Sequence, residues 1–169
     1  MEANPLILTL TLNQEAFDFF TQLRTEYFPP ERNYLQAHLT LFHHLPPSEN
    51  SVLDTLTEIC KHQKAMDLEV SDLMSLGNGV AFKIDSQELF ELYKHLQSQW
   101  EPFLIPQDKQ KLRPHITIQN KVKPEVAKET EKEVRQTFNP FRIIGTGFTL
   151  WEYMGGPWKL YHQFTFLSE

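Results

Sequence analysis

The stretch Arg113-Pro114-His115-Ile116-Thr117-Ile118-Gln119 repeats the pattern of an earlier one, Gln36-Ala37-His38-Leu39-Thr40-Leu41-Phe42. Each contains a histidine, an apolar residue, a threonine and a second apolar residue, at His38–Leu41 and at His115–Ile118. Composition alone would give two such matches in roughly one chain in a thousand. A single copy would be typical of an ordinary half-buried strand, but the pair indicates a functional pattern.

The two motifs have the alternation of β-strands with one polar face and one apolar face. Side chains of an extended strand point to opposite faces in turn, so His115 and Thr117 share one face while Ile116 and Ile118 share the other. The earlier motif has the same arrangement. We expect the apolar faces to be buried in a core and the polar faces to line a cleft.

The same alternation extends beyond the motifs. It places Tyr34 and Phe42 on the face of His38, and Arg113 and Gln119 on the face of His115. It also directs His43 to the opposite face, away from the cleft.

Length and composition predict one globular domain over residues 1–169. The chain is 40% hydrophobic and 22% charged, which is ordinary for a soluble protein. Pro5 to Leu12 is apolar but is expected to form a first strand rather than a signal peptide, and no stretch is long enough to span a membrane. Cys60 is the single cysteine, so an intrachain disulfide is excluded and a cytoplasmic location is expected.

The distribution of charge favours a small anionic ligand. The net charge of -6 argues against a broad nucleic-acid-binding surface. Residues 109–124 nevertheless contain five basic residues and no acidic one, and residues 32–48 contain one basic residue and no acidic one. Positive charge gathered around both motifs suits an anion held in one cleft. The alternative is that the lysines only keep a strand soluble.

The predicted elements form a half-chain unit that occurs twice. In order they are a strand at 6–12, a helix at 14–27, a motif strand at 34–44, a helix ending near 62, a hairpin of strands 66–76 and 80–85, a helix at 87–100, a motif strand from 112, a helix at 125–138, and strands at 141–154 and 158–167. This order predicts an α+β fold in which two antiparallel β-sheets face each other across a central cleft, with helices on the outside.

Two His-x-Thr-x strands in a chain of this length resemble the two-histidine (2H) phosphoesterase superfamily. Residues 113–118 especially resemble its bacterial 2′-5′ RNA ligase-like, or cyclic phosphodiesterase, branch. The resemblance implies a bilobal fold with pseudo-twofold symmetry, in which each lobe supplies one motif to the central cleft. It also implies action on the 2′,3′-cyclic phosphate of a short RNA end or a small nucleotide, without a metal or another cofactor.

Opening a cyclic phosphodiester requires a base that activates water and an acid that protonates the leaving ribose oxygen, on opposite sides of phosphorus. His38 and His115 suit these two tasks, because the pKa of histidine is about 6.5. Thr40 and Thr117 are expected to donate hydroxyl hydrogen bonds to the phosphate, and Arg113 to add a charged contact. We expect His38 to be the acid and His115 the base, although the sequence leaves the direction of substrate binding open. In reverse, the pair would join a 5′-hydroxyl to a cyclic phosphate.

A bound base needs an aromatic surface on which to stack. The candidates are Phe42, Tyr34 and Trp151, with Tyr153 and Trp158 near the final turn. A metal site built from His38 and His44 is not expected, because six residues of strand separate them by roughly 20 Å.

Two other functions fit the same residues. One is a nucleotide-binding module that does not catalyse a reaction, and the other is a hydrolase of another phosphoester, such as a cyclic dinucleotide or a sugar phosphate. We expect a monomer, although the sequence does not fix the oligomeric state.

Overall fold

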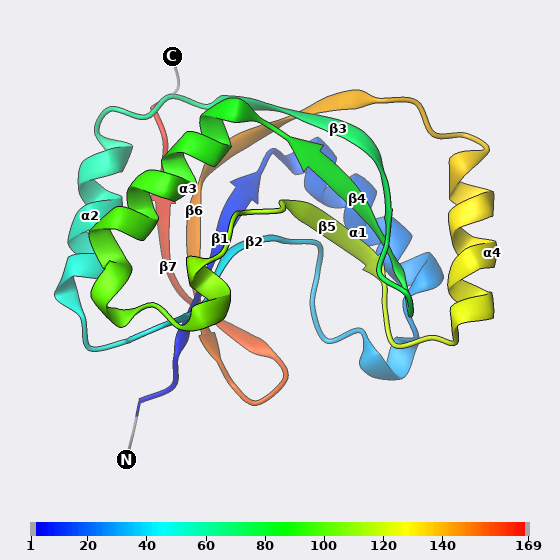
Figure 1. Cartoon of the computed structure of the whole chain (residues 1–169), viewed down its shortest axis with the longest axis horizontal. Helices are drawn as coiled ribbons and strands as arrows, with labels where there is room; N and C mark the ends of the chain where they lie inside the picture. Colours follow the sequence, from blue (N-terminus) through cyan, green and yellow to red (C-terminus); the bar gives the residue numbers. More distant parts are fainter. Residues whose placement is uncertain (1–2, 168–169) are drawn as a thin grey trace.

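The computed structural model describes residues 3–167 and consists of two units of similar element order (Figure 1). The first unit contains β1 (Leu6–Leu12), α1 (Gln14–Tyr27), β2 (Leu39–Leu45), α2 (Asn50–Cys60) and β3 (Met66–Ser75). The second contains β4 (Val80–Asp85), α3 (Gln87–Trp100), β5 (His115–Gln119), α4 (Pro124–Arg135), β6 (Phe141–Tyr153) and β7 (Trp158–Thr165). Three short 3-10 helices complete the order: η1 (Pro30–Arg32), η2 (Glu101–Phe103) and η3 (Pro106–Lys109).

Local sequence signals explain several element boundaries. Helix α3 begins after Ser86, whose side chain accepts a hydrogen bond from the Leu89 backbone N–H at 3.1 Å. The β3–β4 hairpin turns at Gly77, which has a φ of +82° that favours glycine. Both motif strands are shorter than predicted, and β2 begins one residue after His38. None of the helices in residues 3–167 is long and apolar enough to cross a membrane.

The strands are ordered β2-β1-β6-β3-β4-β5, and β7 also pairs with β6. All of these pairings are antiparallel, and the order reads equivalently from either end with the two motif strands at the edges. Residues 145–152 of β6 pair with β1, while residues 141–145 pair with β3. The α+β class is therefore confirmed, and the two predicted antiparallel sheets are two halves of one hydrogen-bonded sheet that share β6.

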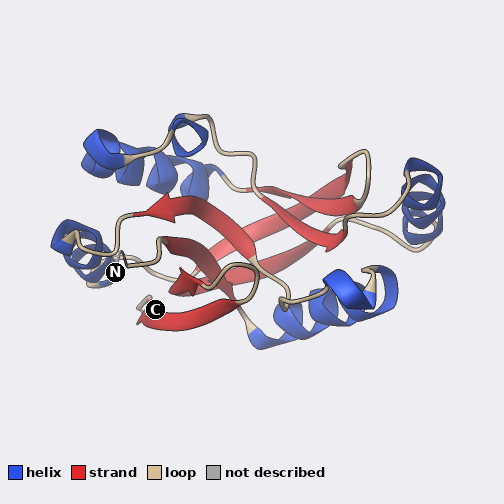
Figure 2. Ribbon diagram, turned by 90° about the horizontal axis from the view of Figure 1, so that it is seen from below, coloured by secondary structure: helices blue, strands red, loops and turns tan. Residues whose placement is uncertain are grey.

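The helices lie around the periphery of this sheet (Figure 2), and two of them cross over to support the motif strand of the other unit. The rings of Tyr93 and Trp100 from α3 pack on Phe42 of β2, with centroids 4.7 and 5.0 Å away. Helix α1 contacts β5, and its Phe20 packs on Phe82 of β4 at 5.2 Å. Burial of these aromatic rings contributes much of the core energy, so each motif strand depends on a helix of the other unit.

A β-bulge interrupts each motif strand directly after its threonine, and it changes the predicted pattern of faces. On β2, Thr40 pairs with Thr9 whereas Phe42 pairs with Leu8, so Leu41 is the extra residue. On β5, Ile118 is the extra residue in the same position. The prediction that Phe42 faces the cleft was therefore wrong, because the bulge turns it into the core, where it is fully buried. The position of Gln119 was also wrong, since this side chain is buried and donates to Thr130 Oγ1 at 2.7 Å.

Candidate active site

The structure brings the two motifs together around a cavity of about 390 Å³, called here the central cavity. Its lining includes both histidines and both threonines of the motifs, together with the predicted anion-binding arginine: His38, Thr40, His115, Thr117 and Arg113. His38 directly precedes β2 and Thr40 lies in it, while the other three come from β5 and the segment before it. Five sequence-predicted residues that lie far apart in the chain therefore share one concave site.

The two histidines have the same local geometry. His38 Nδ1 lies 2.9 Å from the main-chain oxygen of Gln36, and His115 Nδ1 lies 2.8 Å from that of Arg113. A carbonyl oxygen only accepts, so Nδ1 carries the proton in each ring and donates it. The opposite nitrogen, Nε2, remains free for proton transfer with a ligand in the central cavity.

His38 is held in its neutral form. Its pKa is lowered to about 4, mainly by burial and also by the positive charges of Arg24, His115 and His43, while the hydrogen bond to Gln36 acts in the opposite direction. Its ring keeps some exposed surface, but the ring of Trp158 lies only 4.6 Å away, centroid to centroid. At neutral pH the Nε2 atom of His38 is therefore an acceptor.

Arg24 is a buried cation that connects the two motif regions and that sequence reasoning missed. From α1, its guanidinium donates to the main-chain oxygen of Leu35 at 3.1 Å and to that of Thr117 at 3.0 Å. It also donates to Asn33 Oδ1 and lies 4.3 Å above the ring of Phe28. Burial lowers its pKa to about 10, so it stays charged at neutral pH and adds positive potential near His38.

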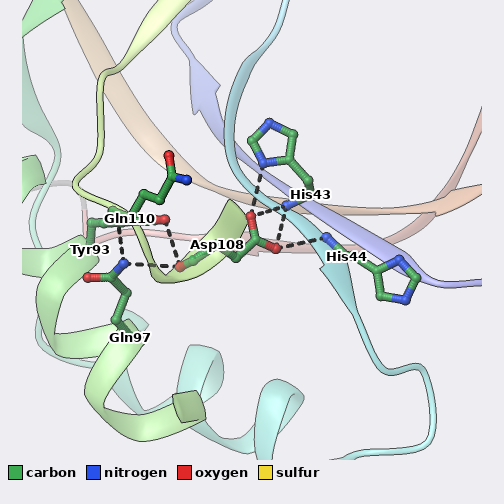
Figure 3. Close-up of polar contacts among 6 residues, drawn as sticks. All are labelled: His43, His44, Tyr93, Gln97, Asp108 and Gln110. Carbon is green, nitrogen blue, oxygen red and sulfur yellow. Dashed lines mark hydrogen bonds and ion pairs between the residues drawn. The ribbon is translucent and has the colours of Figure 1, made fainter. Parts of the chain in front are cut away.

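Asp108 anchors the segment that precedes the second motif (Figure 3). Its fully buried carboxylate accepts hydrogen bonds from the backbone N–H groups of His43 and His44 and from His43 Nδ1, at 2.9 to 3.0 Å. Its main-chain oxygen accepts from Tyr93 Oη and Gln97 Nε2. These bonds compensate the cost of burying the charge and fix η3 against β2 and α3.

His43 lines the central cavity, so the prediction that it faces away from the cleft was wrong. The bulge at Leu41 shifts the alternation by one residue and turns Phe42 inward and His43 toward the cavity. Asp108 binds Nδ1 of the imidazole, which leaves Nε2 as its free nitrogen. Within residues 3–167, no group of three or more histidine, cysteine, aspartate or glutamate side chains is placed to hold a metal ion.

Three of the five aromatic candidates lie beside the first motif histidine. Tyr34 and Trp151, together with Trp158, line a second cavity of about 500 Å³ that also includes His38. Tyr34 is 61% exposed, and the Trp151 Nε1–H donates to Thr9 Oγ1 at 3.0 Å. A larger cavity of about 780 Å³ lies between α1, the end of α4 and the start of β6, and contains none of the motif residues.

Comparison with known proteins adds a family and a fold. A model of the 2′-5′ RNA ligase superfamily matches residues 12–157. The protein TT0787 of Thermus thermophilus superposes with a TM-score of 0.69 at 16% identity, over 98% of this chain and 99% of that one. Escherichia coli LigT complexed with 3′-AMP gives 0.63 at 19%, over 99% and 100%, and a structure described as a phosphoesterase gives 0.64 at 20%, over 99% and 100%. None of the curated proteins matches this sequence.

Proposed function

The chain belongs to the 2′-5′ RNA ligase superfamily, and from this premise we propose that it hydrolyses 2′,3′-cyclic phosphates to 2′-phosphates. The substrate is the cyclic end of a short RNA or a small nucleotide. The same site would catalyse the reverse joining of a 5′-hydroxyl to a cyclic phosphate. The nucleotide 3′-AMP in a LigT structure of the same fold supports a nucleotide ligand in this chain.

The proposed reaction is an in-line displacement at phosphorus. One histidine takes a proton from the attacking water at its Nε2, and the other gives a proton to the 3′-oxygen as the bond between that oxygen and phosphorus breaks. The hydroxyls of Thr40 and Thr117 and the guanidinium of Arg113 bind the phosphate oxygens, on which negative charge is carried in the transition state. The product is a 2′-phosphate with a free 3′-hydroxyl.

The matched geometry of the two histidines carries this proposal. In each ring a main-chain carbonyl two residues earlier binds Nδ1, so both Nε2 atoms remain available in the same cavity. A base and an acid on opposite sides of one phosphorus atom are what the displacement requires. Two hydroxyl donors and one guanidinium in the same lining meet the need for anion binding.

Product analysis tests the proposal. Wild type, His38→Ala and His115→Ala are incubated with 2′,3′-cyclic AMP and with a short RNA that ends in a cyclic phosphate, in the presence of a chelator. We expect wild type to form only the 2′-phosphate and each variant to lose at least about 10²-fold in rate, the range typical of general acid–base catalysis. His95→Ala, on the exposed surface of α3, serves as the matched control and should retain full activity.

Two results would contradict the proposal. If the wild type binds the nucleotides but converts none of them, the chain is a nucleotide-binding module. If either histidine variant keeps the wild-type rate while folded, that histidine has no part in proton transfer. Incubation of a 5′-hydroxyl RNA with a cyclic-phosphate RNA then tests the reverse reaction by the appearance of a 2′-5′ linkage.

A further inference from the structure

The central cavity adjoins two other cavities that have none of their described lining residues in common, so we treat the three as a row. The central cavity shares His38 and Trp158 with the cavity of about 500 Å³, called here the aromatic cavity. On its other side it shares Lys111, Leu112 and Arg113 with a cavity of about 620 Å³, called here the basic cavity. A ligand bound between the two histidines is therefore in reach of both neighbours.

The two outer cavities occupy equivalent places in the pseudo-symmetric fold. Tyr34 and Gln36 precede His38 by the same intervals as Lys111 and Arg113 precede His115. Thr11 and Lys83 also correspond. Lys83 of β4 pairs with His115 of β5. Thr11 of β1 lies opposite His38, because the preceding residue, Leu10, pairs with Leu39. Any difference between the outer cavities thus comes from the side chains at matched backbone positions.

The side chains at these matched positions differ in charge. The aromatic cavity is lined by no lysine, arginine, aspartate or glutamate among the described residues, whereas the basic cavity has three cations and one acid, Asp85. Lys83 Nζ lies 4.0 Å from Asp85 Oδ2, an exposed and weak contact, and Lys111 Nζ lies 5.3 Å from the ring centroid of Phe90. The basic cavity therefore favours an anionic group, with an excess of two positive charges.

The aromatic cavity suits a nucleobase. Trp151 and Trp158 are half-buried, with ring centroids 6.1 Å apart, and Tyr34 is largely exposed. These rings line the cavity and could stack on a base, and the lining also contains amide and hydroxyl groups for the polar edge of a base. The ring of Trp158 also contacts that of His38, which sets a stacked base directly beside the catalytic site.

The chemistry of ribose links the two ends of this row. The base is attached at C1′, next to C2′, whereas the 5′-phosphate is carried from C4′, next to C3′. A nucleotide with its cyclic phosphate in the central cavity and its base in the aromatic cavity therefore extends its 5′ side toward the basic cavity. The same placement sets the 2′-oxygen on the side of His38 and the 3′-oxygen on the side of His115.

We propose that the preferred substrate is a cyclic-phosphate nucleotide that also carries a 5′-phosphate, as the last nucleotide of an RNA strand does. Its base lies on Trp158 and its 5′-phosphate at Lys83 and Lys111, while Arg113 stays with the reacting phosphate. This inference rests on the proposed function. His115 then protonates the departing 3′-oxygen, and His38 takes the proton of the attacking water, which reverses the roles expected from sequence.

The protonation state of His38 agrees with this orientation. With a pKa of about 4, His38 is neutral at pH 7, so it is poorly suited to be the acid and well suited to be the base.

The first experiment measures substrate preference. The kcat/KM of wild type is compared on 2′,3′-cyclic AMP with and without a 5′-phosphate, and on the dinucleotide that ends in a cyclic phosphate. We expect the 5′-phosphate and the dinucleotide each to raise kcat/KM about tenfold, as a charge-assisted contact would. The ratio of kcat/KM with the 5′-phosphate to kcat/KM without it should fall to near one in the double variant Lys83→Gln/Lys111→Gln. It should stay at the wild-type value in the control Lys128→Gln/Lys132→Gln, which removes two positive charges from α4.

If the dinucleotide has a higher kcat/KM than 2′,3′-cyclic AMP but the 5′-phosphorylated nucleotide does not, the gain comes from the second nucleoside, and the proposed phosphate site is wrong. A wild-type ratio near one for both, with good hydrolysis of 2′,3′-cyclic AMP, would overturn this inference but leave the proposed function intact. If wild type hydrolyses none of the three compounds, the proposed function itself fails.

The second experiment identifies the acid. A substrate with sulfur in place of the 3′-oxygen has a leaving group that needs no proton, so it should restore activity to His115→Ala and not to His38→Ala. Restoration of His38→Ala instead would reverse the proposed orientation of the substrate.

Discussion

Replacement of Arg24 by methionine tests whether one buried cation holds the two motif regions together. The variant keeps an unbranched side chain but removes every donor. The main-chain oxygens of Leu35 and Thr117 then lose the partner that satisfies them inside the protein. An unsatisfied buried acceptor costs about 1–3 kcal/mol, so the two together predict a loss of about 2–6 kcal/mol in the free energy of unfolding.

Urea unfolding followed by tryptophan fluorescence measures this loss, because Trp100 is fully buried and reports on the core. With a slope of about 2 kcal/mol per molar, a loss of about 4 kcal/mol lowers the midpoint by about 2 M. Arg32→Met is the matched control, since Arg32 is exposed on η1, and it should change stability by less than about 0.5 kcal/mol. An Arg24→Met midpoint equal to that of the control would refute the reasoning.

The pH dependence of activity in the folded Arg24→Met protein gives a second test. The positive charge of Arg24 helps to keep the pKa of His38 low. Without it, the pKa of His38 should rise, and the acidic fall in kcat/KM should move to higher pH. An unchanged pH profile in the folded variant would remove Arg24 from the electrostatics of the site.

Three further outcomes are expected. Asp108→Asn should lower stability by about 1–3 kcal/mol and raise KM, because the amide cannot accept from all the N–H groups that the carboxylate binds; urea unfolding and steady-state kinetics measure both. Phe42→Ala should lower the free energy of unfolding by about 3–5 kcal/mol, because Phe42 is fully buried in the core. Tyr34→Ala should change it by less than about 0.5 kcal/mol, because Tyr34 is exposed. Equal losses in the two variants would contradict these positions. The pKa of His38 is about 6.5 in the unfolded chain and about 4 in the folded protein, so between these pH values the unfolded chain binds more protons. The free energy of unfolding therefore decreases as the pH falls from about 6.5 to about 4. This decrease should be smaller in His38→Gln than in wild type.

Sequence reasoning succeeded where the physical cause is local. Helix α3 was predicted to span residues 87–100 because its cap at Ser86 and its apolar spacing lie within that segment. The faces of His38 and Thr40 also followed from strand alternation alone, up to the bulge. Phe42 and His43 could not be placed correctly, because the bulge depends on how β2 pairs with β1 and leaves no mark in the motif itself.

Long-range contacts explain the other residues that were missed. Arg24 lies 93 positions from Thr117 and Asp108 lies 65 positions from His43, so neither partnership has a signal in sequence spacing. Each is an ordinary charged residue of a helix or loop until the fold buries it. The twin motifs identified the central cavity, whereas the groups that position it became visible only through tertiary structure.

The sharing of β6 between the two halves of the sheet has a mechanical consequence. Gly145 pairs with Leu12 on one edge and with Met66 on the other, and a Cβ atom there would stand 2.9 Å from Leu10 Cδ2. Bending the halves apart at this point would break hydrogen bonds to β1 and β3 at once and would separate α1 from β5 and Tyr93 from Phe42. The two halves of the protein are thus joined by one continuous strand rather than by a flexible linker. We therefore expect the two halves to resist opening, and discrimination between ligands to depend on fit to the existing site rather than on closure around them.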